Sequence, residues 1–413
     1  MNQRPITVIR FRLRGFRSCK DTELNPTQNV TALIGPNGSG KTNLLQGLSL
    51  LRGEPDRSKY YWREKDSSAL RCEIEADFKL RRRIIQYRAS VIFRPNDVGR
   101  EDVLDLNEEW NLQRRGRRSN WTALSPYGRF FARRSEYSDD RVYFRNPTRL
   151  RARSGRKISK NLSDAIWEIK NFCTRISYYT ASQFTNPSQC PTSFEIDEDN
   201  DLVLSATNPG DHQKFIYNLY VIQHRRPEQY ASFLNLVGRG GLHLIDDIKW
   251  KPVKFPSQTY EVKSGGRLIN RKGQRTLVVP TIHIGSARLS FNQLSEGTFR
   301  TLALLFHVIT DRSTILLLEE PEVCVHHGLL NSVIEVIKSF SQSKQIIFST
   351  HSEAVVDLLE PDQVRLVSIS PRKGTVVAPI SESLSAKNYE ALKDYLTNTG
   401  SLGEYWRTAG FSE

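Results

Sequence analysis

Short apolar runs and amphipathic stretches alternate in both end regions of the chain. Continuous apolar runs of four or five residues are typical of strands buried on both faces of a parallel sheet. Stretches whose apolar residues recur every three or four positions are typical of helices with one buried face. Strands that alternate with helices predict an α/β fold with a mostly parallel, doubly wound sheet. We expect strands at Val30 to Ile34, Ile315 to Leu318, Ile346 to Ser349 and Val364 to Ile369, and helices at Thr42 to Leu51, Phe299 to Ile309 and Leu330 to Phe340.

The middle of the chain is less regular. Two strand-like runs, Cys72 to Phe78 and Ile84 to Phe93, favour an antiparallel β layer. No heptad repeat lasts for more than a turn or two, which argues against a long coiled-coil arm. Further along we expect a helix at Asn161 to Cys173, a strand at Ile176 to Thr180, two helices within His212 to Val237 and several strands up to Ile284.

A glycine-rich loop joins the first buried strand to the first helix. Residues 35–42, GPNGSGKT, match the pattern G-x-x-x-x-G-K-[ST] in full. Glycines let backbone N–H groups turn toward phosphate oxygens, and the helix N-terminus adds a partial positive charge. Lys41 can reach the β- and γ-phosphates, and the Thr42 hydroxyl can bind Mg²⁺. The loop predicts a nucleotide site formed by Gly35, Asn37, Gly38, Ser39, Gly40, Lys41 and Thr42.

Two adjacent carboxylates follow the strand Ile315 to Leu318. In a nucleotide hydrolase, the first can hold the Mg²⁺ shell and the second can polarise the attacking water. We therefore assign Glu319 to the metal and Glu320 to the general base. By itself, an apolar run followed by acids also marks an ordinary strand end, so this assignment depends on the glycine-rich loop.

Two further motifs are less specific on their own. LSEGT at 294–298 begins a predicted helix, where Ser295 and the Gly297 N–H could bind a phosphate, although an ordinary helix N-cap is the simpler interpretation. His351 follows a predicted strand, 31 residues beyond Glu320, and a single histidine there is more often structural than catalytic.

The four motifs in this order resemble those of the ABC-type ATPases of the SMC, RecF and OLD group. The resemblance covers residues 1–95 and 280–413 and implies an ABC-type P-loop NTPase head that hydrolyses ATP to ADP and phosphate with Mg²⁺. Residues 96–279 would form a helical and mixed insertion, or lid, between the P-loop and the signature motif. The matching stretches are GFRS at 15–18, GPNGSGKT, LSEGT, LLLEEPE at 316–322, FSTHSEAVVDLL at 348–359 and SLGEYW at 401–406.

The resemblance also implies that two heads enclose two ATP molecules. Ser295 and Gly297 would then act in trans on the nucleotide of a second copy. His351 would contact the γ-phosphate as a catalytic residue beside Glu320 and Lys41, and Gln183 is the candidate for a further Mg²⁺ contact. The expected state is therefore a homo-oligomer, with a head-to-head dimer as its smallest form.

The chain departs from the group in two places. The stretch EPEVCVHH at 320–327 keeps Glu322 and His326, but Val323, Cys324 and His327 replace the group's usual residues at the dimer seam. The coupling between two sites is therefore in question. OLD proteins also carry a TOPRIM nuclease, whereas the roughly sixty residues after His351 contain no convincing cluster of metal-binding carboxylates.

The net charge of +15 is concentrated in one segment. Residues 114–160 hold 15 basic and 3 acidic residues, a net +12 that should attract a polyanion or an acidic protein face. Aromatic residues between the arginines could stack on unpaired bases or could pack a small subdomain. The candidate contacts are Arg114, Arg115, Arg117, Arg118, Arg133 and Arg134.

Cysteine usage and hydropathy exclude several classes. The five cysteines are scattered and never form a C-x-x-C pair, so we expect reduced, buried thiols and neither disulfides nor a zinc site. The apolar runs are far shorter than the roughly 20 residues that cross a bilayer, and the N-terminal residues lack the continuous apolar core of a secretory signal. We expect a cytoplasmic protein with no membrane partner.

The sequence favours one function and leaves two alternatives open. The first is a regulatory ATPase of a bacterial antiphage defence system, which senses infection and controls a separately encoded toxin or nuclease. The second is a RecF-like repair or maintenance ATPase that binds DNA through the basic segment, with strong salt dependence. A transporter ATPase is the least supported, because the insertion is long and no membrane segment is present.

Overall fold

The computed structural model describes most of the chain, in two compact units. The described residues are 6–52, 70–95, 101–112, 121–124, 152–154, 156–180, 186–197, 203–204, 210–263, 267–398 and 400–409. The first unit comprises residues 1–179, 312–321 and 334–413, and the second comprises residues 180–311 and 322–333. In the described part of the chain, no helix combines the length and apolar character that a bilayer crossing demands.

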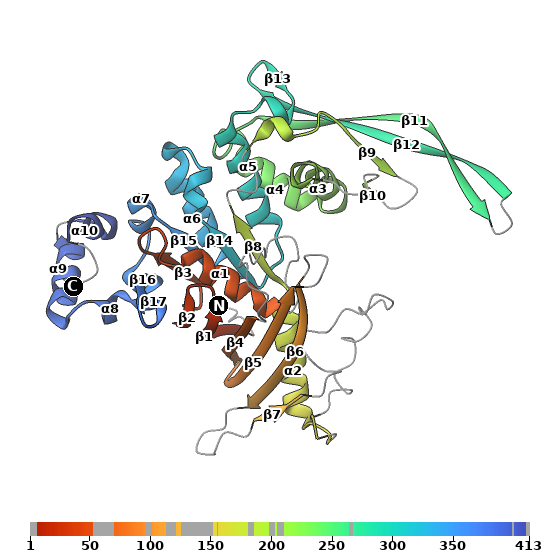
Figure 1. Ribbon diagram of the computed structural model, residues 1–413. Helices are drawn as coiled ribbons and strands as arrows, with labels where there is room; N and C mark the ends of the chain where they lie inside the picture. Colours follow the sequence, from red (N-terminus) through yellow and green to blue (C-terminus); the bar gives the residue numbers. More distant parts are fainter. Residues whose placement is uncertain are drawn as a thin grey trace. The chain divides into compact units, whose positions relative to one another are not determined.

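One mixed sheet organises the first unit (Figure 1). The described strands follow the order β7-β6-β5-β4-β1-β2-β17-β16-β3-β15-β14-β8. β16, β3, β15 and β14 are parallel neighbours, and the antiparallel strands are hydrogen-bonded onto them through β17. The strands are β1 (Ile6–Phe16), β2 (Cys19–Leu24), β3 (Val30–Ile34), β4 (Leu70–Leu80), β5 (Arg83–Pro95), β6 (Glu101–Leu112), β7 (Thr122–Ala123), β8 (Ile176–Thr180), β14 (Ile315–Glu319), β15 (Gln345–Thr350), β16 (Val364–Ser370) and β17 (Gly374–Pro379).

The apolar runs explain the centre of this sheet. All five residues of β3 and all six of β15 are buried, as expected for parallel strands covered on both faces. Gln345 is fully buried at the start of β15, where its amide donates to the carbonyls of Val8 and Thr27 and accepts from the Val8 N–H. The helices of the first unit are α1 (Lys41–Ser49), α2 (Lys160–Cys173), α6 (Leu330–Phe340, which begins in the second unit), α7 (Glu353–Val356), α8 (Ile380–Ser383), α9 (Ala386–Asn398) and α10 (Leu402–Ala409).

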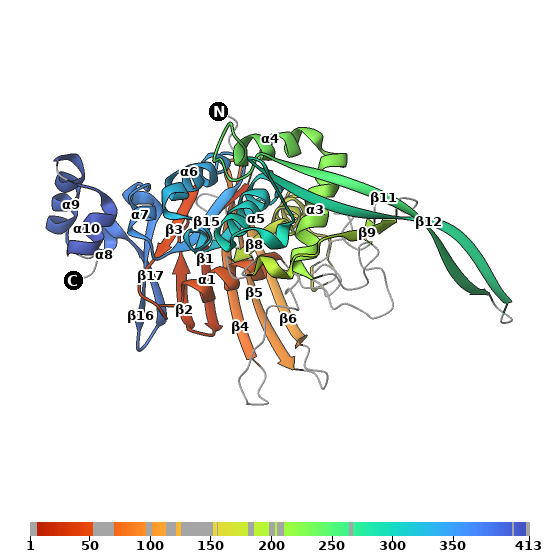
Figure 2. The ribbon, with the colours of Figure 1, turned by 90° about the horizontal axis from the view of Figure 1, so that it is seen from above.

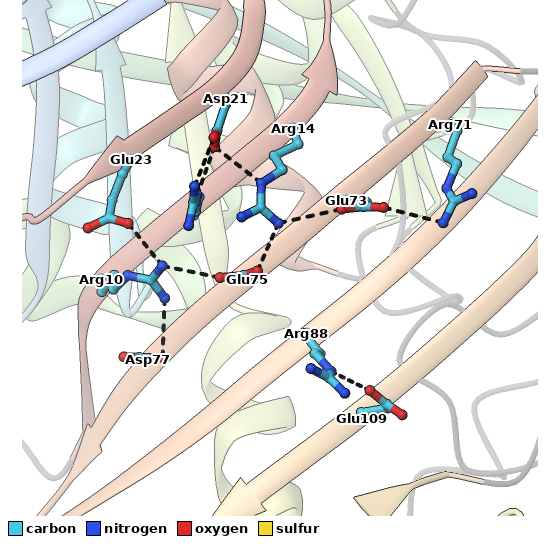
Figure 3. A network of polar contacts seen from close by, with 11 residues as sticks. Arg10, Arg14, Asp21, Glu23, Arg71, Glu73, Glu75, Asp77, Arg88 and Glu109 are labelled. Carbon is cyan, nitrogen blue, oxygen red and sulfur yellow. Dashed lines mark hydrogen bonds and ion pairs between the residues drawn. The ribbon is translucent and has the colours of Figure 1, made fainter. Parts of the chain in front are cut away.

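The antiparallel strands have one apolar face and one charged face. Phe11 and Leu13 of β1 are buried, while Arg10, Arg12 and Arg14, which alternate with them, face acids on β2 and β4 (Figure 3). Cross-strand pairs of opposite charge stabilise such sheets. Arg12 also holds the pKa of the Asp21 carboxyl below its usual range by hydrogen bonding. The contacts include Arg10 with Glu23 at 2.9 Å and Glu75 at 3.1 Å, Arg12 with Asp21 at 2.7 Å, and Arg14 with Glu75 at 3.0 Å.

The second unit combines helices with a smaller sheet. In its core, the ring of Phe215 packs edge to face against the rings of Phe299 and Phe306, with 5.5 Å between the centroids in each pair. β11 and β12 pair over seventeen positions, about 55 Å of ribbon, and extend away from the helices of this unit (Figure 2). The elements are β9 (Phe194–Asp197), β10 (Val203–Leu204), β11 (Asp247–Lys263), β12 (Arg267–Ile284), β13 (Ala287–Leu289), α3 (Asp211–Arg225), α4 (Pro227–Val237) and α5 (Glu296–Thr310).

Most expected elements are present, and the antiparallel β layer expected from the runs at 72–78 and 84–93 is part of the same sheet as the parallel strands. β1 continues through Gly15 to Phe16, and the chain reverses at Arg17 and Ser18. The expected buried thiols are confirmed for Cys19, Cys72, Cys173 and Cys190; burial raises the pKa of the Cys72 thiol to about 12.

Candidate nucleotide and magnesium site

The glycine-rich loop connects β3 to α1 in a conformation that requires glycine. Gly35, Gly38 and Gly40 have φ angles of 153°, 78° and 100°, which L side chains rarely adopt. A Cβ atom on Gly40 would lie 1.9 Å from the Thr375 Oγ1 atom, whereas one on Gly38 would meet nothing within 4 Å. The loop is therefore tightly packed against β17 at Gly40 and open at Gly38.

A hydroxyl network fixes the underside of the loop. Thr375 of β17 donates a hydrogen bond to the Ser39 carbonyl at 2.9 Å, and its Oγ1 lies 2.8 Å from Ser18 Oγ. Asn43 of α1 donates to Ser18 Oγ at 2.8 Å. The sequence motif did not indicate Ser18 or Thr375, because they are far from the loop along the chain.

The polar groups of the loop fit a bound phosphate. Lys41 is 5% exposed, and its ammonium donates to the carbonyls of Gly35 at 2.8 Å and Pro36 at 3.1 Å. The hydroxyl of Ser39 is buried and has no hydrogen-bond partner among the described residues. A buried hydroxyl of this kind is costly unless a ligand satisfies it. Asn37 and Gly38 are exposed at the rim.

The oxygen ligands expected for Mg²⁺ lie together beside the loop. The Thr42 hydroxyl donates to Oε1 of Glu319, and the Tyr178 hydroxyl donates to Oε2 of the same carboxylate at 2.5 Å. The described residues contain no group of three or more acidic, histidine or cysteine side chains that could hold a metal by themselves. This donor set fits Mg²⁺, which typically takes one or two protein oxygens and completes its shell with phosphate and water.

Glu320 leaves the end of β14 in a strained conformation. Its φ is 46°, in the left-handed region that is uncommon for residues other than glycine. Its N–H donates to the Ser349 carbonyl at 3.1 Å, and its Oε1 lies 3.4 Å from Nε2 of His351. Burial and the Lys41 charge lower the pKa of His351, and Glu320 partly opposes them. Burial and the Lys41 charge therefore favour the neutral form of the imidazole.

The signature motif and the seam residues belong to the second unit. Ser295 is the N-cap of α5, and its Oγ accepts from the Thr298 N–H at 3.2 Å, which confirms the helix-cap interpretation. A Cβ on Gly297 would meet nothing within 4 Å. Val323 is 52% exposed, and His326 caps the next turn by accepting from the Gly328 N–H. These features leave the roles of Ser295 and Gly297 in trans as a prediction.

Seven of the expected contact residues lie outside the described part of the chain. Gln183 lies outside the described residues, so its contact with Mg²⁺ stays a prediction. The six candidate contacts of the basic segment also lie outside them: Arg114, Arg115, Arg117, Arg118, Arg133 and Arg134.

A family model matches most of the chain, over residues 30–357, and is described as "AAA domain, putative AbiEii toxin, Type IV TA system". The chain belongs to this family. The matched range contains the P-loop, the signature motif, both carboxylates and His351. Family membership confirms the expected class, a P-loop ATPase related to the SMC group.

Individual relatives match over short segments. The chromosome partition protein Smc of Methanococcus voltae is 39% identical over 49 residues, which cover 12% of this chain and 4% of that protein. Smc of Mycoplasma pneumoniae is 41% identical over 61 residues, which cover 14% of this chain and 6% of that protein.

Two solved SMC heads align with most of the chain at low sequence identity. An SMC head bound to the C-winged helix domain of ScpA is 14% identical, with a TM-score of 0.49, and the alignment covers 92% of this chain and 99% of that chain. The SMC head of Thermotoga maritima is 14% identical, with a TM-score of 0.41 and 90% and 98% covered.

Proposed function

We propose that the protein is an ATP-hydrolysing switch whose active site is completed by a second copy of the chain. The observation that carries the nucleotide and metal site of this proposal is the hydrogen bond between Thr42 and Glu319, which are 277 positions apart in the sequence. It joins the start of α1, directly after the phosphate-binding loop, to the end of β14 within the first unit. Such an arrangement is expected of a site for a nucleotide and its metal.

Each side chain then has a specific task. Lys41 exchanges its two carbonyl partners for phosphate oxygens, and the loop amides and Ser39 donate to the same phosphates. Bound at Thr42 and Glu319, Mg²⁺ would neutralise phosphate charge. Glu320 accepts a proton from the attacking water, and the neutral His351 donates a hydrogen bond toward the γ-phosphate.

The second copy supplies the remaining phosphate contacts. Ser295 and Gly297 stand at the N-terminus of a fifteen-residue helix, where N–H groups and the helix dipole favour an anion. The absence of any atom near a Cβ of Gly297 within the described chain is compatible with a close approach by another molecule. ATP would hold the two copies together, and hydrolysis would release them.

The biological role that we propose is regulation of a separately encoded toxin or nuclease in bacterial antiphage defence. The family description, "putative AbiEii toxin, Type IV TA system", supports a partnership between two components, although it names the family itself as the toxin. A trigger would act by shifting the equilibrium toward or away from the state that ATP stabilises. A RecF-like role in DNA maintenance is the alternative, and it depends on the basic segment at 114–160.

Replacement of the proposed base is the test of the chemistry. Glu320→Gln keeps the shape of the side chain but cannot accept a proton, so turnover should fall about 10²–10⁴-fold while ATP still binds. Steady-state phosphate release, equilibrium ATP binding and size-exclusion chromatography with ATP measure the three quantities. Glu390→Gln, at an exposed ion pair on α9, is the matched control. Unchanged turnover in Glu320→Gln would remove Glu320 from this role.

A further inference from the structure

Tyr178 contacts the metal-binding carboxylate from a different element than the phosphate loop. It lies on β8, the neighbour of β14 at the edge of the sheet, 141 positions before Glu319 in the sequence. Its hydroxyl donates to Oε2 of Glu319, and Thr42 donates to Oε1. Both oxygens of the carboxylate are therefore held, one from each side.

A glutamate needs such support at a metal site. Its side chain has three rotatable bonds, so an unsupported carboxylate loses rotamer freedom when it binds a metal. Hydrogen bonds from neighbouring groups remove this freedom beforehand and fix which lone pairs face the metal. A donor on each oxygen of Glu319 leaves the remaining lone pairs of the carboxylate for the ion or its water shell.

We propose that Tyr178 is a positioning residue for Mg²⁺, which acts by orienting Glu319 and does not itself bind the ion or the nucleotide. The proposal rests on the proposed function, because it requires the ion to bind beside Thr42. It makes β8 part of the metal site, although no sequence motif marks this strand as functional. A tyrosine that served only to pack β8 against the sheet would affect folding but not the affinity for the ion.

The chain offers a matched control at the next position. Tyr179 is the next residue of the same strand, is 1% exposed and carries the same hydroxyl, but consecutive side chains of a strand point to opposite faces. Tyr178→Phe and Tyr179→Phe each remove one hydroxyl from β8. Only the first variant removes a hydrogen bond to Glu319.

Binding of Mn²⁺ to the full-length protein tests the proposal without turnover. Electron paramagnetic resonance reports free Mn²⁺ during a titration in the presence of a non-hydrolysable ATP analogue. Tyr178→Phe should weaken the Mn²⁺ affinity about 10-fold or more, within the range for lost supporting hydrogen bonds at metal sites. Tyr179→Phe should keep the wild-type affinity. Binding of the analogue in EDTA should be the same in all three proteins.

The outcomes separate this proposal from the function on which it rests. A wild-type affinity for Mn²⁺ in Tyr178→Phe would overturn the role of Tyr178 alone. Equal losses in the two variants, or loss of analogue binding in EDTA, would show a role in folding and would also overturn it. Failure of the wild-type protein to bind Mn²⁺ with the analogue would instead contradict the proposed ATPase site.

Discussion

His351 lies beside Glu320 near the end of β14, and its pKa responds to burial and to two nearby charges. Burial and the Lys41 charge lower the pKa of the imidazole, and Glu320 raises it. The folded protein therefore binds fewer protons at His351 than the unfolded chain just below pH 6.5. Stability from this group rises with pH through that window and is constant above it. A neutral imidazole carries a single ring N–H, so His351 has one hydrogen bond to donate in that form.

The pKa of His351 should respond in opposite directions to two substitutions. Lys41→Met removes a nearby positive charge and should raise the pKa, whereas Glu320→Gln removes a negative charge and should lower it further. Nuclear magnetic resonance titration of the histidine Cε1 protons, assigned by loss of one signal in His351→Gln, measures both shifts. Shifts of the same sign, or none, would show that the three side chains are not close neighbours in solution.

At this scale the sequence predicted residues whose chemistry is local. The run from Gly35 to Thr42 would bind phosphate largely through its own backbone, so the sequence motif alone is enough to predict the site. Ser18, Tyr178 and Thr375 act through contacts with residues 25 to 357 positions away. Their roles depend on which strands become neighbours, and a pattern read along one chain does not contain that information.

The C-terminal helix α10 is packed against α7, the short helix that follows His351 (Figure 1). The Gly403 N–H donates to Oδ1 of Asp357 at 2.6 Å, and a Cβ on Gly403 would lie 2.2 Å from the Glu353 carbonyl oxygen. This contact gives a physical reason for the glycine in SLGEYW. It also connects the end of the chain to the segment that carries His351.

Gly403→Ala should therefore push α10 away from α7. The expected cost is about 1–3 kcal/mol, as for other overpacked contacts, despite the better helix propensity of alanine. Turnover should fall as well, because α7 begins two residues after His351. Thermal unfolding and phosphate release measure the two effects. Gly210→Ala, where a Cβ meets nothing within 4 Å, is the control; equal stability of the two variants would contradict this account of the contact.

Element types were predicted better than element partners. The buried strands and amphipathic helices have strong periodic patterns, and they occur close to the expected positions. The length of the β11–β12 ribbon was not foreseen, because its mixed polar sequence has no clear period.

At the scale of the whole molecule, the proposed catalytic residues and the signature motif belong to different compact units. The P-loop, both carboxylates and His351 belong to the first unit, and the signature motif belongs to the second. In an isologous dimer, each copy would offer its signature to the P-loop of the other copy. Every site would then contain residues from two chains, so defects in different motifs should complement each other.

Mixing two inactive variants tests this central claim most directly. Lys41→Ala should not bind phosphate, and Ser295→Arg should block the partner's nucleotide, so each variant alone should lack ATPase activity. After subunit exchange, half of the dimers would contain one intact site of two, and the mixture should regain about a quarter of the wild-type rate for independent sites in a two-fold dimer. A mixture no more active than the separate variants, under conditions in which the wild type is active, would contradict the account.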